Sequence, residues 1–190
     1  MKRALLALTA SLWIAPVLVA QDSSAPTAFI AGGPAMGTRA PDFSLPWATK
    51  DGPGNEQWFS LSAQRGRVVV LAFYPADFTK GCTAEMQTFT ERFDELFGDD
   101  VTLVAISTDS IDSHVRFASS IGAPFKFLSD PTQEISRKYG SAGPDGRNRR
   151  TVWVLDRKGQ VSYIELRFNA LDPQAYSDLK QAVQAARRAS

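Results

Sequence analysis

The sequence has only one cysteine and one histidine among its 190 residues, and this scarcity limits the chemistry open to it. A lone cysteine, Cys82, excludes a disulfide within the chain and the Cys-x-x-Cys pair that thiol–disulfide exchange requires. A structural zinc ion needs about four ligands, mostly Cys or His, so the sequence argues against such a site. We therefore expect no metal and no cofactor.

The chain has no strong excess of positive or negative charge, because 21 basic residues are balanced by 20 acidic ones. This balance argues against nucleic acid or an anionic membrane as the main partner. The sequence also has no internal repeat. Hydrophobic residues make up 44% of the chain, which suits one globular domain with a full core.

The start of the chain differs in kind from the rest. Two basic residues precede an apolar run, Ala4–Ala20, a layout typical of a secretory signal peptide. An uncleaved membrane anchor is the alternative, although the run is short for a bilayer. We expect a signal peptide at 1–20, a flexible leader at 21–38 and one folded domain at 39–190. Export into the periplasm follows if the source is Gram-negative.

The order of apolar patterns predicts the fold, with regular structure beginning at Pro41. The expected strands are 41–45, 58–61, 68–74, 101–107, 125–128, 151–155 and 161–166, and the expected helices are 82–97, 111–121, 134–139 and 171–188. The first two strands should form a hairpin. This order indicates an α/β, thioredoxin-like fold: a central mixed sheet flanked by helices, with an N-terminal β-hairpin.

Cys82 falls in the first turn of the helix that follows the strand 68–74. Free backbone N–H groups and the positive end of the helix dipole favour an anionic sulfur at that place. The thiolate is the form that attacks peroxide oxygen. Thr79 lies three residues earlier, close enough for its hydroxyl to reach the sulfur or a bound peroxide. Pro75 would fix the loop and shield the sulfur from water.

Arg150, directly before the strand 151–155, is the best candidate for a second charged group at the sulfur. A guanidinium is always charged and offers several donors in one plane, so it can hold the thiolate and polarise a peroxide together. Arg149 is a weaker rival, because its spacing to Asp156 fits less well.

These residues form a pattern that resembles a known family. Pro75-x-x-x-Thr79-x-x-Cys82 is similar to the signature of peroxiredoxins, and the longer string 73–85 resembles their Q-type subfamily, the bacterioferritin comigratory proteins. The segments 127–131 and 150–156 are similar to further conserved segments of that family. The resemblance covers about Arg39 to Arg188 and implies an AhpC/TSA-type, thioredoxin-fold domain.

The resemblance implies a thiol peroxidase that reduces hydrogen peroxide and organic hydroperoxides. Cys82 would be the peroxidatic cysteine, oxidised to sulfenic acid. Thr79 and Arg150 would bind and orient the peroxide, and Pro75 would limit exposure of the sulfur. The backbone N–H groups of Gly81 and Cys82 would help to stabilise the developing charge.

The sequence departs from the family at two places. Many Q-type members carry a resolving cysteine five residues after the peroxidatic one, where this chain has Gln87. The second half-reaction must therefore use an external thiol: a thioredoxin- or glutaredoxin-like protein, or a small thiol. The connection 143–150 is also shorter than the family's usual one, so the resemblance does not define the rim of the pocket or the preferred peroxide. Glu85 matches a family acid for which we expect a dipole or capping contact. A monomer or weak homodimer is expected.

Less specific interpretations stand beside these. Cys82 would then be a small buried hydrophobe, Thr79 a helix cap and Arg150 a solvated charge. His114 is expected on the polar side of its helix and thus away from the sulfur. The basic segment Arg147–Arg150 is either a solvated loop or a surface for an anionic partner. A non-catalytic protein, or a thiol–disulfide exchange protein on the same fold, is the alternative function.

Overall fold

The computed structural model describes residues 29–30, 32–55 and 57–189. The expected signal peptide at 1–20 lies outside the described residues, as does the first part of the expected leader, up to residue 28. Within the described residues, no helix combines the length and the apolar character needed to cross a bilayer.

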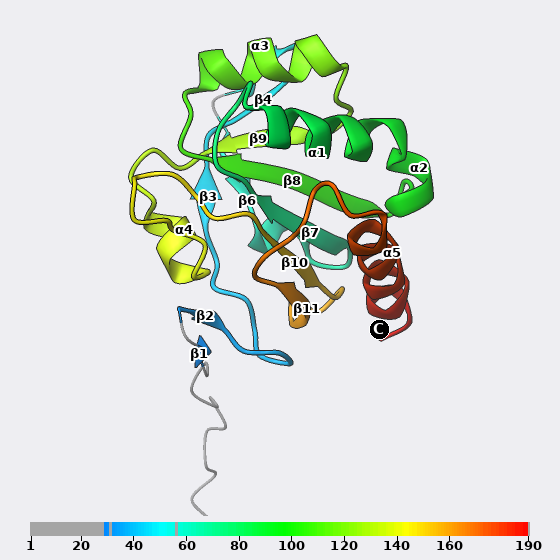
Figure 1. The fold of residues 1–190 in the computed structure, drawn as a ribbon. Coiled ribbons are helices and arrows are strands. Elements are labelled where there is room, and N and C mark those ends of the chain that lie inside the picture. The colour runs from blue at the N-terminus through cyan, green and yellow to red at the C-terminus, as the bar shows by residue number, and fades with distance from the viewer. Residues whose placement is uncertain (1–28, 31, 56, 190) are drawn as a thin grey trace, which may run out of the picture.

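A seven-stranded mixed sheet forms the centre of the molecule (Figure 1). In spatial order its strands are β11 (Val161–Glu165), β10 (Thr151–Leu155), β7 (Val68–Phe73), β8 (Val101–Ser107), β9 (Lys126–Ser129), β4 (Trp47–Thr49) and β5 (Gly52–Pro53). The strands β7, β8 and β9 are parallel, and the other pairings are antiparallel. All residues of β7 are buried, as its continuous apolar run predicts for a strand covered on both faces.

Helices cover both faces of the sheet, and they confirm the expected α/β architecture. They are α1 (Lys80–Glu91), α2 (Phe93–Leu96), α3 (Ile111–Ile121), α4 (Glu134–Lys138), α5 (Pro173–Arg188) and a short 3-10 turn at Ser62–Gln64. The expected single helix 82–97 is wrong, because the backbone leaves helical geometry at Arg92. The Arg92 N–H still donates to Thr88 O at 3.0 Å, so the break is tight and the apolar spacing continues across it.

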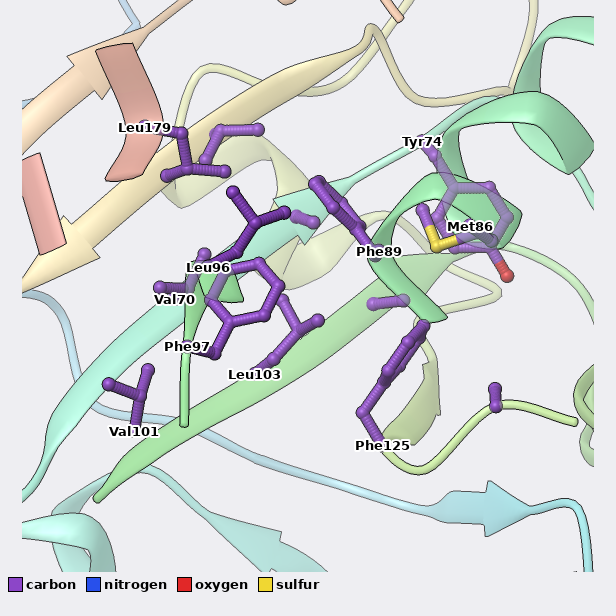
Figure 2. Packing of buried hydrophobic residues seen from close by; sticks show 14 of the residues in the cluster. Val70, Tyr74, Met86, Phe89, Leu96, Phe97, Val101, Leu103, Phe125 and Leu179 are labelled. Carbon is purple, nitrogen blue, oxygen red and sulfur yellow. The ribbon is translucent and has the colours of Figure 1, made fainter. Parts of the chain in front are cut away.

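The sheet separates two clusters of buried apolar side chains. Successive residues of β7 point to opposite faces, so Val70 joins the cluster beneath α1 and α5 while Leu71 joins the other. Figure 2 shows the first cluster, where Phe89 of α1 and Leu179 of α5 pack near Val70 and Leu103. The second cluster includes Leu45 of β3 (Ser44–Leu45), Phe59 of β6 (Phe59–Ser60) and Ile135 of α4. Coverage on both faces fixes the ends of β7 and β8, and thereby the loops that follow them.

Two small sheets complete the N-terminal part. The expected pairing of the first two strands is confirmed, because β3 pairs antiparallel with β6. They are not joined by a single turn, since β4 and β5 lie between them in the chain and belong to the central sheet. Regular structure does not begin at Pro41 as expected, because β1 (Phe29–Ile30) already pairs with β2 (Gly33–Pro34). Gly33 is buried against Trp153, where a Cβ atom would lie 2.8 Å from the indole ring.

Candidate active site

Cys82 lies in the first turn of α1, directly after the loop that leaves β7. Its side chain is buried, with 1% of the residue exposed. The first backbone N–H of α1 to be bonded within the helix belongs to Thr83, which donates to Thr79 O at 2.8 Å. The N–H groups of Gly81 and Cys82 precede this first bond, so they contribute to the positive end of the helix. The expected helix-start position of the sulfur is therefore confirmed.

Thr79 occupies the N-cap position of α1 in extended backbone geometry. Its hydroxyl makes no capping bond and instead donates to Ala76 O at 3.1 Å. The capping interpretation is therefore wrong. Since the hydroxyl proton is used inside the loop, the oxygen keeps its lone pairs to accept a hydrogen bond from another group.

Arg150 reaches the sulfur from a distant part of the chain. The register of β10 on β7 pairs Thr151 with Phe73, so Arg150 lies beside the start of the loop that leads to α1. Its Nη2 donates to Cys82 Sγ at 3.4 Å. A Cβ atom at residue 81 would lie only 3.2 Å from Nη2, so Gly81 provides the room for this approach. The contact between Arg150 and Cys82 was expected, and the contribution of Gly81 through its missing side chain was not.

Glu85 is part of the same cluster. Its carboxylate is fully buried and accepts from Nη1 of Arg150 through Oε2, while Oε1 has no hydrogen-bond partner among the described residues. Among the described residues Glu85 does not make the expected capping contact, because its side chain points inward and pairs with Arg150. Burial raises the pKa of Glu85 to about 7, and this outweighs the lowering by Arg150.

The charge of Arg150 is secured by its two partners. Burial alone would lower its pKa, but the nearby Glu85 and Cys82 together raise the pKa above its ordinary value. One guanidinium therefore bridges a buried carboxyl and a buried sulfur.

The loop that holds Thr79 is itself fixed by buried polar groups. Pro75 is half-buried directly after Tyr74, whose O–H donates to Asp77 Oδ1 at 2.6 Å. His114 Nδ1 lies 3.0 Å from Asp77 Oδ2, and its Nε2 lies 3.2 Å from Leu128 O. His114 is thus fully buried, which corrects its expected place on the polar side of α3. It contacts the loop rather than the sulfur.

The remaining candidates are placed clearly. Arg149 is exposed, and Arg150 is the residue that contacts the sulfur, as the register to Asp156 predicted. Gln87, at the position of the absent resolving cysteine, is exposed on α1. Among the described residues, no group of three or more His, Cys, Asp and Glu side chains is arranged to hold a metal ion.

Residues 36–164 match the family model described as the AhpC/TSA family. The chain belongs to the AhpC/TSA family. Its curated AhpC/TSA relatives include the chloroplastic peroxiredoxin Q of Triticum aestivum, 34% identical over 143 residues, which cover 74% of this chain and 63% of that protein. A peroxiredoxin bcp of Coxiella burnetii is 32% identical over 136 residues, 68% of this chain and 86% of the relative. The resemblance to Q-type peroxiredoxins is thereby confirmed.

Two solved structures show the same fold. The reduced 2-Cys peroxiredoxin of Plasmodium vivax superimposes with a TM-score of 0.70 at 24% identity, covering 80% of this chain and 82% of that one. The bacterioferritin comigratory protein of Xanthomonas campestris gives a TM-score of 0.64 at 25% identity, covering 75% and 92%. These likenesses confirm the expected thioredoxin-like architecture.

Proposed function

We propose that this chain is a thiol-dependent peroxidase that reduces hydrogen peroxide and organic hydroperoxides through Cys82. The observation that carries the proposal is the contact of Arg150 Nη2 with Cys82 Sγ, 3.4 Å, at the amino end of α1. A positive helix end and a guanidinium act on the same sulfur, and both favour the nucleophilic thiolate. The membership in the AhpC/TSA family and the named peroxiredoxin relatives support this proposal.

The proposed first step breaks the O–O bond of the peroxide. The Cys82 thiolate attacks one peroxide oxygen, which becomes the S–OH oxygen of a sulfenic acid, and the other oxygen takes a proton and leaves as water or an alcohol. Thr79 Oγ1 has lone pairs to accept from the peroxide O–H. Arg150 and the N–H groups of Gly81 and Cys82 stabilise the charge that develops on the oxygens. Pro75 limits the access of water to the sulfur.

The second step needs a thiol from outside. Cys82 is the only cysteine of the chain, so no intramolecular disulfide can form. An external thiol attacks the sulfenic sulfur, water leaves, and a mixed disulfide remains. A second thiol then releases Cys82 as a thiol and carries away a disulfide.

Peroxide consumption in the presence of a small thiol tests the proposal. Cys82→Ser should abolish it, and Arg150→Met should lower the rate constant with hydrogen peroxide by about 10²–10³-fold, because a preorganised charge at the reacting oxygens is lost. Arg188→Met, which removes an exposed arginine at the end of α5, is the control and should change little. Equal consumption by wild type and Cys82→Ser would refute the enzyme assignment.

We also propose that the chain is exported and that the mature protein is a monomer or weak homodimer. The basic start and the run Ala4–Ala20 support export, and they rest on the sequence alone. The intact mass of the protein recovered from a periplasmic extract should correspond to a chain that begins near residue 21. Gel filtration of the same protein should give the size of a monomer or a weak homodimer. An unprocessed chain in the membrane fraction would contradict cleavage.

A further inference from the structure

A cleft with several guanidinium groups opens beside the proposed peroxide site. It has a volume of about 590 Å³ and is lined by Gly140, Arg149, Arg150, Leu166, Arg167 and Phe168. Two segments build most of it, one directly before β10 and one directly after β11, and Gly140, which follows α4, completes the lining. The antiparallel pairing of these strands brings the segments together, and the Phe168 N–H donates to Arg150 O at 3.1 Å.

The cleft has an excess of positive charge. Arg149 and Arg167 are exposed, and within the described part of the chain neither guanidinium forms an ion pair. Arg150, the third cation, is shared with the sulfur and with Glu85. The acid nearest in sequence to Arg167 is Glu165, whose carboxylate accepts from the Arg167 backbone N–H at 2.8 Å. This single carboxylate does not balance the positive charges of Arg149 and Arg167, so the cleft keeps a net positive charge.

Cleft and sulfur are connected through Arg150, which lines the first and contacts the second. Because only 1% of Cys82 is exposed, a slender molecule reaches the sulfur with less rearrangement than a cysteine on the surface of another protein. The volume of the cleft matches pockets for small molecules. Guanidinium pairs bind carboxylates with bidentate geometry, and Leu166 and Phe168 provide an apolar wall.

We propose that this cleft binds the reductant, and that the reductant is a small thiol carrying carboxylate groups. The inference rests on the proposed function, since it concerns the thiol that reduces the sulfenic form of Cys82. The carboxylates lie on Arg149 and Arg167, and the thiolate attacks the Cys82 sulfur. The S–OH bond breaks, the oxygen leaves as water after taking the thiol proton, and an S–S bond to the reductant forms. A second molecule of the same thiol releases reduced Cys82 and a disulfide.

The test compares thiols that differ in charge. The sulfenic form is prepared with one equivalent of hydrogen peroxide, confirmed by intact mass, and mixed with mercaptosuccinate, 2-mercaptoethanol or cysteamine at low ionic strength. The remaining sulfenic acid is trapped with a 1,3-diketone at timed points. For each thiol, the rate constant of wild type is divided by the rate constant of Arg149→Gln/Arg167→Gln with the same thiol, so the intrinsic reactivity of that thiol cancels. The double variant Arg116→Gln/Arg188→Gln removes two exposed arginines outside the cleft as a matched control.

We call Arg149→Gln/Arg167→Gln the cleft variant. With dianionic mercaptosuccinate we expect it to react about tenfold more slowly than wild type. Its rate constant with neutral 2-mercaptoethanol should lie within about twofold of wild type, and with cationic cysteamine it should be no lower than wild type. The difference should shrink in high salt, because exposed charges are screened. Equal ratios for all three thiols would overturn the proposal. The proposal would also be overturned if a thioredoxin-type protein reduced the sulfenic form faster than every small thiol did, and if the cleft variant were reduced by that protein as fast as wild type. Failure of peroxide to form any sulfenic acid would instead refute the peroxidase function itself, and the cleft assignment with it.

Discussion

Folding changes the protonation of Glu85 in the range around neutral pH. It is fully buried, only one of its carboxylate oxygens has a partner, and burial raises its pKa from 4.5 to about 7. Between these two values the folded chain binds a proton at Glu85 that the unfolded chain has released. Because stability falls with pH wherever the folded state binds more protons, this carboxyl should destabilise the protein as pH rises through that range.

Replacing Glu85 by glutamine should therefore change the pH dependence of stability. We subtract the free energy of unfolding of Glu85→Gln from that of wild type. This difference should fall by about 3 kcal/mol as the pH rises from 4.5 to above 7, and it should be constant below pH 4. Urea unfolding at constant ionic strength, in steps of pH, measures this. Glu91→Gln removes an exposed carboxylate from the same helix and is the control. If wild type and Glu85→Gln lost stability in parallel as the pH rises, burial would not raise the pKa of Glu85.

At the scale of elements, the active-site loop is held between α1, α3 and the end of β8. Asp77 accepts from Tyr74, lies within hydrogen-bond distance of His114 of α3, and donates through its backbone N–H to Asp109 Oδ2 at 2.9 Å. Nδ1 of His114 faces the Asp77 carboxylate, and Nε2 faces the carbonyl oxygen of Leu128. The histidine thereby links the loop to β9.

Removing this link should loosen the loop and destabilise the fold. His114→Ala removes a fully buried ring that is a hydrogen-bond partner of Asp77, and losing one partner of a buried polar group costs about 1–3 kcal/mol before the cavity is counted. Urea unfolding should show that loss, whereas Arg116→Ala, at an exposed site on the same helix, should stay within about 0.5 kcal/mol of wild type. If the two variants proved equally stable, the network would be dispensable for the fold. Asp77→Asn in the His114→Ala background should recover part of the loss, since no buried charge then remains.

Elements with a clear apolar period could be predicted from the sequence, and those that depend on polar partners could not. The strand β8 and the helix α3 lie where expected, because their apolar residues alone define them. His114 was placed on the wrong face, since a histidine counts as polar in any periodic pattern until its distant partner Asp77 is known. The pair β1–β2 was missed because two-residue strands carry no period.

The same distinction applies to the candidate site. Cys82 and Arg150 were found from a helix start, a strand start and a family signature, and the structure brings them together. The inward role of Glu85 was missed, because the expected helix began at Cys82 and so placed this carboxylate in the first turn, where a carboxylate ordinarily serves the helix dipole. The helix α1 begins at Lys80 instead, and Glu85 lies beyond its first turn. The cleft was equally beyond the sequence, since Arg149 and Arg167 become neighbours only when β10 and β11 pair.

At the scale of the whole molecule, the reactive sulfur is assembled from parts that are far apart in the chain. Cys82 and Arg150 are separated by 68 positions, and the sheet between them sets their contact. A chain with one cysteine has no second sulfur to close a disulfide on the sulfenic form. Protection of that form therefore depends on a thiol from outside.

Excess peroxide should consequently inactivate the protein when no thiol is present. Without a partner, the sulfenic acid reacts with further peroxide to give sulfinic and then sulfonic acid, which thiols do not reverse. Intact mass should show two or three oxygens added at Cys82, with permanent loss of peroxidase activity, whereas a small thiol included from the start should prevent both. Cys82→Ser serves as the control, because it reports the oxygen added elsewhere, above all at Met36, which is 56% exposed. A wild-type protein that stayed at one added oxygen and recovered fully when a thiol was supplied late would mean that the fold itself shields the sulfenic acid from a second peroxide.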